Sequence, residues 1–174
     1  MGFCFFACSR EDMRHLCPVT DAPCQDIGRH HPARGVHIYS GQPTIVFLTV
    51  CAADRKPWLA DPAVHQSLRA AWQSAHAWLV GYYLLMPDHL HLFCAPHDVG
   101  FTLEKWVAFW ERQFRRLHHD PDSRWQFHPF HHRLRRQESY TGKWNYVREN
   151  PLRKGLVKNP DAWPYQGMMN TLRW

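Results

Sequence analysis

The stretch that decides the fold reads Met86-Pro87-Asp88-His89-Leu90-His91-Leu92-Phe93. Its Pro-Asp pair is typical of a turn, and the alternation that follows is typical of a β-strand. Residues i and i+2 of a strand share a face, so His89 and His91 point to one side and the intervening leucine to the other. Two imidazoles on one face can hold a divalent metal ion, although histidines on the solvent face of an amphipathic strand give the same pattern.

A second informative stretch lies about fifty residues downstream. Helical spacing predicts a helix from Glu138 to Asn150, in which Tyr140, Trp144 and Val147 fall at i, i+4 and i+7 and form an apolar stripe. We expect this stripe to pack against the rest of the domain.

Tyr146 lies off this stripe, about 200° around the helix from Trp144. Its neighbours on the helix surface are Lys143, three residues before it, and Asn150, four residues after it. A phenol beside a lysine and a carboxamide, away from the packing face, is a candidate nucleophile. A partly buried surface tyrosine with a satisfied hydroxyl is the plain structural alternative.

Together the two stretches resemble a known family, the single-tyrosine HUH transposases, and specifically the REP-associated tyrosine transposases of bacteria. The shared pattern is a hydrophobic strand, then Met-Pro-(Asn/Asp)-His-hydrophobic-His, then a helix with a tyrosine followed four residues later by Asn-Pro. The matching segments are Tyr82–His91, Tyr146–Pro151, Thr44–Thr49, His132–Arg135 with Glu138-Ser139, Gly155–Val157 and Trp163–Tyr165. The resemblance runs from Val36 to Gly167 and so covers most of the chain.

The resemblance implies a metal-dependent tyrosine transposase that cleaves and rejoins single-stranded or hairpin DNA derived from repeats. It implies that Tyr146 forms a 5′-phosphotyrosine, and that His89, His91 and Asn150 hold Mg²⁺ or Mn²⁺. One departure is His131, which stands where many relatives carry an acidic residue. Relatives work as monomers or as homodimers, and this sequence is compatible with either state.

The basic charge is one-sided. Residues 1–100 carry a net charge of −1 and residues 101–174 a net charge of +7, within a total of +6. Basic residues interleaved with aromatic ones suit unpaired nucleic acid, because cations neutralise phosphates and aromatic faces stack on bases. A solvated helix face is the alternative for any single cluster. The candidate DNA-binding residues are Arg112, Arg115, Arg116, Arg133, Arg135, Arg136 and Lys143.

Residues 1–35 have no counterpart in the family pattern, and we expect a poorly ordered extension there, followed by one domain over 36–174. Four cysteines lie in this extension, but their spacing lacks the paired knuckles of common zinc modules: Cys4, Cys8, Cys17 and Cys24. No apolar run approaches the length needed to span a bilayer, and no signal segment is recognisable. We therefore expect a bacterial cytoplasmic protein that associates with the nucleoid through DNA.

Local patterns predict an α+β architecture, an antiparallel sheet with helices packed on it, which the resemblance sharpens to the ferredoxin-like HUH nuclease fold. The predicted strands are Val36–Tyr39, Thr44–Cys51, Trp78–Met86, His89–Cys94 and a short extended piece near residues 126–131. One predicted helix is capped by Asp61 and reaches about His76, and a second spans Thr102–Leu117. The apolar face of the second is expected to be Leu103, Trp106, Val107, Trp110, Phe114 and Leu117.

Three other function classes can be compared with a transposase. A histidine-triad hydrolase needs a third histidine where the chain has Phe93, and the chain also lacks a phosphate-cradling glycine loop. A non-catalytic DNA-binding protein or repressor of the same fold is the main alternative, and a binding module for structured RNA is the third. A metal-dependent covalent adduct with DNA would separate a transposase from all three.

Overall fold

The computed structural model describes residues 44–134 and 139–173. In this part of the chain the strands form one five-stranded antiparallel sheet in the order β4-β1-β3-β2-β5. The strands are β1 (Val46–Cys51), β2 (Trp78–Met86), β3 (His89–Pro96), β4 (Phe130–Arg133) and β5 (Gln166–Met168). The histidine-bearing strand β3 is central, between β1 and β2. The expected α+β fold is confirmed, and the predicted strand Val36–Tyr39 and the boundary at residue 35 lie outside the described residues.

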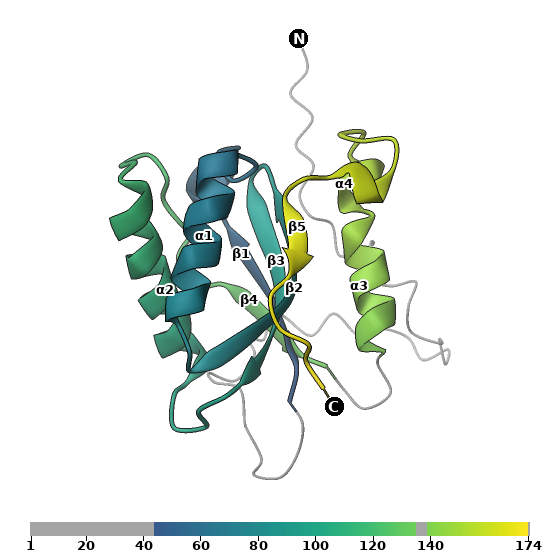
Figure 1. Ribbon diagram of the computed structural model, residues 1–174. Coiled ribbons are helices and arrows are strands. Elements are labelled where there is room, and N and C mark those ends of the chain that lie inside the picture. The colour runs from purple at the N-terminus through teal and green to yellow at the C-terminus, as the bar shows by residue number, and fades with distance from the viewer. Residues whose placement is uncertain (1–43, 135–138, 174) are drawn as a thin grey trace, which may run out of the picture. The chain divides into compact units, whose positions relative to one another are not determined.

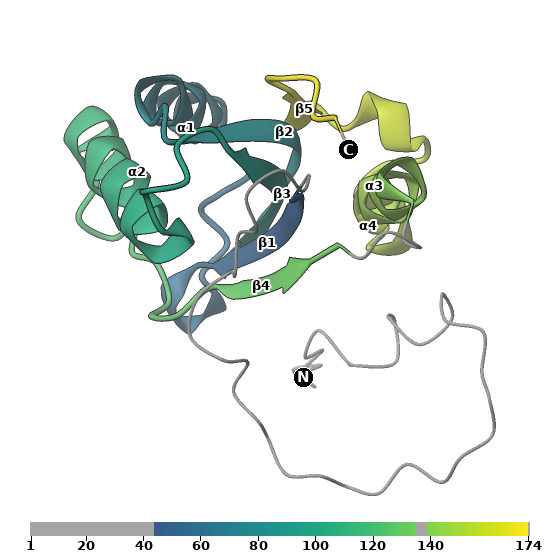
Figure 2. The same ribbon diagram turned by 90° about the horizontal axis from the view of Figure 1, so that it is seen from below.

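Helices cover both faces of the sheet (Figures 1 and 2). Helices α1 (Pro62–Ser74) and α2 (Leu103–His118) pack side by side on one face. Helix α3 (Tyr140–Arg148) and the single turn α4 (Asn150–Arg153) lie over the other face. We call these the α1/α2 face and the α3 face.

The sheet has an apolar core on each face, and successive side chains of β3 point alternately into one core and the other. Leu90, Leu92 and Cys94 belong to the apolar core under α1 and α2. Phe93 belongs to the core under α3, and the two histidines share its side of the strand. Both histidines are only 7% exposed. The sequence pattern therefore predicted their common face correctly, but that face is covered by α3 rather than by solvent.

The hairpin between β2 and β3 closes tightly, since Met86 pairs with His89 across the Pro87-Asp88 turn. The backbone of this turn is held by neighbouring segments: Ala52 donates its N–H to the Asp88 carbonyl at 2.9 Å and Leu59 donates to the Pro87 carbonyl at 2.9 Å. The turn is thereby fixed from two sides, which fixes the first histidine that follows it.

Helix boundaries follow their caps. Asp61 accepts hydrogen bonds from the backbone N–H groups of Ala63 and Val64, as expected for the N-cap of α1. Along α2 the predicted apolar face is buried except at its end, where Leu117 is 49% exposed. That expectation was wrong because Leu117 lies in the last turn, beyond the edge of the core. No helix among the described residues is long and apolar enough to cross a membrane.

Candidate active site on the α3 face

The histidine pair is oriented by hydrogen bonds to one ring nitrogen of each imidazole. Nδ1 of His89 lies 2.7 Å from Oδ1 of Asp88, and Nδ1 of His91 lies 2.8 Å from the Thr49 hydroxyl. The two rings meet edge to face with centroids 4.7 Å apart. With each Nδ1 engaged, the Nε2 atoms are the ring nitrogens left to bind another group, which is also how metal-ligating histidines are usually held.

Burial keeps His91 in the form a ligand requires. Burial, followed by the charges of His89 and Arg55, lowers the pKa of His91 well below its ordinary 6.5. A neutral imidazole keeps the lone pair that binds a metal ion. His91 also stacks on Phe47, with ring centroids 5.3 Å apart, so its plane is held by packing as well as by Thr49.

Arg55 anchors the other histidine through Asp88, and sequence reasoning missed it. Its Nε lies 2.8 Å from Oδ2 of Asp88, whose other oxygen contacts His89. Burial raises the pKa of Asp88, but the His89 hydrogen bond and the charges of His89 and Arg55 outweigh burial and leave this pKa below its ordinary value. The carboxylate is therefore ionised near neutrality, and it accepts a hydrogen bond from the Nδ1–H of His89.

An unusual backbone conformation brings Arg55 close to Asp88. Arg55 and the preceding Asp54 both have positive φ, 56° and 54°, which side-chain-bearing residues seldom adopt. Two consecutive left-handed residues turn the chain sharply after β1 and aim the guanidinium at the Pro87-Asp88 turn. Such strain persists where surrounding contacts over-determine it, and it is common at functional sites. A signal in sequence is absent, because nothing in the local pattern marks these positions as left-handed.

The tyrosine helix is shorter than predicted. Helix α3 ends at Arg148, and Asn150 begins the separate turn α4, whereas the sequence predicted one helix through Asn150. Pro151 explains the break, because it lacks an N–H and cannot complete the helical ladder to Val147. The predicted start at Glu138 lies outside the described residues. Tyr146 stays on α3, partly buried against the core under that helix.

Arg153 contacts both Tyr146 and Asn150. The sequence did not predict this role for Arg153. Its guanidinium carbon lies 4.3 Å from the ring centroid of Tyr146. Its Nη2 donates to the Tyr146 carbonyl at 2.6 Å and to Oδ1 of Asn150 at 2.5 Å. The same charge contributes to the lowered pKa of His91, after the larger effects of burial and its nearer neighbours, so Arg153 lies near the histidine pair.

The Arg153 contacts bear directly on the predicted metal ligands. The carboxamide oxygen of Asn150, predicted as the third ligand, accepts a hydrogen bond from Arg153. Its assignment as a metal ligand stays a prediction. Among the described residues no group of three or more His, Cys, Asp or Glu could hold a metal ion, so a complete site would need an amide, phosphate or water oxygen beside the two imidazoles.

Two other side chains define the tyrosine's surroundings. Lys143 Nζ lies 5.7 Å from the Phe47 ring centroid, and Phe47 stacks on His91, so Lys143 lies on the site side of α3 as expected. Tyr140 has a structural role. Its hydroxyl accepts the N–H of Tyr82 at 3.2 Å, and burial raises its pKa to about 12. A phenol that is so difficult to ionise is a poor nucleophile.

The described arginines among the predicted DNA-binding residues lie on the α1/α2 face, and only Lys143 lies on the α3 face. Arg112, Arg115 and Arg116 are carried by α2, across the sheet from the histidines. Arg133 pairs with Val46, whose side chain is in the core under α1 and α2, so Arg133 also points to that face. Arg135 and Arg136 lie outside the described residues.

The register also settles the position of His131. This residue pairs with Leu48, whose side chain is in the core under α1 and α2, so His131 faces away from the histidine pair. Its neighbour His132 pairs with Phe47 and faces α3. The departure from the family pattern at His131 therefore leaves the histidine pair and Tyr146 untouched.

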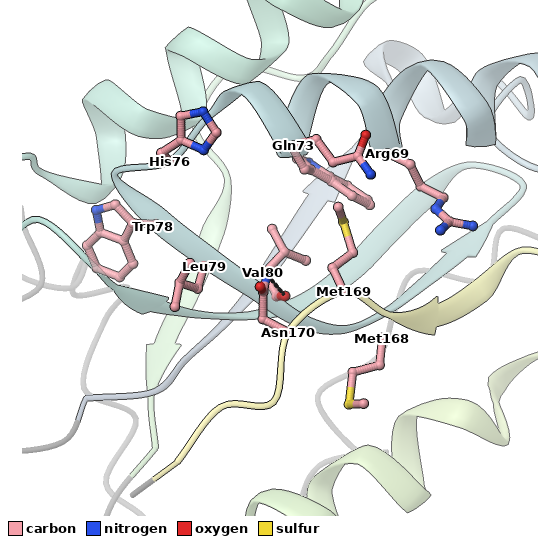
Figure 3. Close-up of a pocket in the computed structure, with 10 residues that line it drawn as sticks. Arg69, Gln73, His76, Trp78, Leu79, Val80, Met168, Met169 and Asn170 are labelled. Atoms are coloured by element: carbon pink, nitrogen blue, oxygen red, sulfur yellow. Dashed lines mark hydrogen bonds between the residues drawn. The ribbon is translucent and has the colours of Figure 1, made fainter.

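One hollow formed by the described residues lies beside α1, away from the histidine pair. This cavity has a volume of about 330 Å³. It is lined by α1, β2 and the residues of β5 and just after it, including Arg69, Gln73 and Asn170 (Figure 3). Asn170 donates its amide N–H to the Val80 carbonyl at 2.9 Å, which ties this segment to β2.

Comparison with known proteins supports the architecture. No family model and no curated protein sequence matches this chain. A solved structure of a REP-associated tyrosine transposase bound to a REP hairpin is similar, with a TM-score of 0.62 and 21% sequence identity. The match covers 75% of this chain and 80% of that chain. The described domain thus shares the fold of a tyrosine transposase.

Proposed function

We propose that this protein is a metal-dependent tyrosine transposase that cleaves and rejoins single-stranded or hairpin DNA through a covalent tyrosine. The observation that carries the proposal is the pair His89 and His91, buried on one strand face with both Nδ1 atoms hydrogen bonded. Tyr146 lies on the helix that covers this same face. The similar fold of a hairpin-bound transposase agrees with this assignment.

In the proposed reaction the Tyr146 oxygen attacks phosphorus and forms a 5′-phosphotyrosine, while the bond from phosphorus to the 3′ oxygen breaks and leaves a 3′-hydroxyl. Mg²⁺ or Mn²⁺ held by the two histidines would supply positive charge to the non-bridging phosphate oxygens. Attack by a 3′-hydroxyl on the phosphotyrosine reverses the step and joins strands. The exchange conserves one phosphoester bond, so it needs no ATP.

Arg153 has two roles in this proposal. An unperturbed phenol titrates near pH 10, so its proton must leave as attack proceeds, and the guanidinium over the Tyr146 ring stabilises the resulting negative charge. Arg153 also holds Oδ1 of Asn150. We propose that binding of metal and DNA phosphate releases this oxygen to become the third ligand.

The direct test is a search for the covalent intermediate. Hairpin DNA from the repeats that flank the gene, labelled on the strand 3′ of the cut, is incubated with the protein and Mn²⁺ or Mg²⁺ and run on a denaturing gel. The wild-type protein should give a labelled protein band. Tyr146→Phe removes one oxygen and should lose this band while it keeps the fold and the affinity for DNA.

Tyr140→Phe is the matched control on the same helix, because that hydroxyl is held by the Tyr82 N–H. Its band should persist. If Tyr140→Phe loses the band and Tyr146→Phe keeps it, the nucleophile is misassigned. If the wild-type protein gives no adduct with either metal, the function reverts to DNA binding without cleavage, the repressor-like alternative.

A further inference from the structure

A second pocket with the chemistry of a nucleotide site lies on the α1/α2 face. It has a volume of about 400 Å³ and lies between α2 and the segment that leads to β4. We call it the α2 pocket; the lining residues that matter here are Glu111, Arg115, Arg124, Trp125 and Phe127. With Glu104, which also lines the pocket, these residues combine aromatic side chains, two cations and two carboxyl groups.

Phe127 is the most exposed large apolar side chain of the described residues that line this pocket, at 84%. It is followed by His128, which has a positive φ of 69° and an imidazole 4.1 Å from the Phe127 ring, measured between centroids. An aromatic ring held out in solvent exposes apolar surface at a cost in free energy. A stacked base would cover it, and every base offers a flat face.

The cations around the pocket suit the backbone of such a nucleotide. Arg115 and Arg124 line the pocket directly. Arg112 and Arg116 are carried by the same helix as Arg115 and add positive charge to this side of the molecule. Guanidinium groups beside an apolar slot match a phosphate chain that carries bases, because the cations pair with phosphate oxygens while the slot accepts a base.

Glu111 places a carboxyl group in the pocket. It lines the pocket and is only partly exposed, and burial, opposed by the Arg115 charge, raises its pKa to about 7. A carboxyl group in an apolar slot is costly unless a partner donates to it. The exocyclic amino group of cytosine is such a donor, whereas thymine presents a carbonyl oxygen in its place.

The segment that lines the pocket leads directly into β4, which pairs with β1. Among the described strands, β4 lies at an edge of the sheet, and Phe130 lies three residues after Phe127. Phe130 pairs with Thr49, which pairs with His91, so its side chain, 48% exposed, lies in the same row as this histidine on the α3 face. Phe127 at the pocket and Phe130 on the α3 face are thus only three residues apart in the chain.

We propose that the α2 pocket binds an unpaired, amino-bearing base of a DNA strand, with cytosine as the model, and that this strand passes over the β4 edge to the histidine site. Phe127 stacks on the base, Glu111 accepts from its amino group, and Arg115 and Arg124 contact phosphate. The pocket is thus a specificity site separate from the point of cleavage. Only the onward path of the strand rests on the proposed function.

The experiment measures binding without cleavage. Fluorescence anisotropy is recorded in a metal chelator at about pH 8.5, where Glu111 is ionised, with labelled oligo(dC) and oligo(dT) of about 12 nucleotides, within the usual range of site sizes for single-strand binders. The wild-type protein should bind oligo(dC) at least about fivefold more tightly than oligo(dT), from one base-edge contact. Phe127→Ala should weaken binding of both oligonucleotides by about fivefold or more, because the stacking surface is removed.

Glu111→Leu should abolish the preference for oligo(dC) while binding itself persists, since the carboxylate that reads the amino group is gone. Leu117→Ala is the matched control, because this exposed residue lies on α2 but does not line the pocket. It should change neither affinity nor preference. Circular dichroism confirms that each variant is folded.

The outcomes separate the two proposals. If folded Phe127→Ala and Glu111→Leu bind as the wild-type protein does, the α2 pocket assignment is overturned, whether or not the Tyr146 adduct forms. If both variants behave as expected but no adduct forms on hairpin DNA, the pocket stands and the transposase proposal fails.

Discussion

The two faces of the sheet use one strand for opposite purposes. Toward α1 and α2, β3 presents Leu90, Leu92 and Cys94, which are fully buried in an apolar core. Toward α3 it presents two histidines with polar partners, followed by Phe93. Both sides are buried, so exposure does not distinguish them. The difference is that every polar atom brought under α3 needs a partner, and those partners fix the geometry of the site.

Because of these polar partners, the α3 face should tolerate fewer substitutions than the apolar core on the other face. An apolar core tolerates substitutions of similar volume, at a cost in stability that depends on packing. A hydrogen-bonded imidazole loses its orientation when one partner is removed. We therefore expect changes on the α1/α2 face to alter stability and DNA affinity, and changes on the α3 face to alter the reaction.

The largest contrast is expected between adjacent residues that point in opposite directions. His91→Ala should abolish cleavage and leave hairpin binding largely intact, because it removes a metal donor. Leu92→Ala should cost about 2–5 kcal/mol of unfolding free energy and leave cleavage per folded molecule unchanged. Denaturant unfolding and cleavage at limiting metal measure the two quantities. Full cleavage by His91→Ala under those conditions would remove the metal assignment.

A smaller effect is expected where a partner of a histidine changes. Thr49→Val keeps the shape but removes the hydroxyl that holds Nδ1 of His91, and it should weaken metal affinity by about 10–100-fold. Cleavage as a function of Mn²⁺ concentration reports this shift. Thr49→Ser is the control, because it keeps the hydroxyl that contacts Nδ1 of His91; it should act like the wild-type protein. A metal dependence in Thr49→Val equal to that of the wild-type protein would show that the hydroxyl does not orient the ring.

Glu111, on the α1/α2 face, should make the free energy of unfolding depend on pH. Its folded-state pKa of about 7 is above the ordinary 4.5, so the folded protein holds this proton more tightly than the unfolded chain does. The resulting stability is present below the ordinary value and is lost as the pH rises through 7. Relative to Glu111→Gln, the wild-type free energy of unfolding should fall by up to about 3 kcal/mol over this range. If the free energies of unfolding of the two proteins, measured by denaturant titration at each pH, changed in parallel, the raised pKa of Glu111 would be contradicted.

The smallest expected effect concerns surface charge. Arg115→Gln combined with Arg116→Gln should lower the slope of log affinity against log salt concentration by about one unit for each phosphate that is no longer neutralised. Lys143→Gln, on the α3 face, should change the cleavage rate more than this slope. Salt titrations of hairpin binding measure the slope, and the denaturing gel measures the rate. An unchanged slope in the double variant would show that these arginines are ordinary solvated charges.

Local patterns predicted most of the elements. The alternation around His89 and His91 predicted a strand, and the Asp61-Pro62 pair predicted the start of α1. The spacing of Tyr140 and Trp144 predicted the packing side of α3. Such predictions succeed because periodicity and capping are properties of neighbours in the chain. The end of α3 was missed, although Pro151 carried the signal for it.

Sequence by itself determined which residues are candidates for the chemistry: two histidines one strand period apart, and a tyrosine off the packing stripe of its helix. Only the tertiary structure decided what holds them. Arg55 reaches Asp88 through a left-handed turn, and Arg153 reaches Tyr146 from beyond a helix break. The gathering of Arg112, Arg115, Arg116 and Arg133 on the α1/α2 face, with Lys143 on the α3 face, likewise depended on strand order and register. These arrangements depend on packing across the sheet and on local backbone geometry, which no periodic pattern in the sequence records.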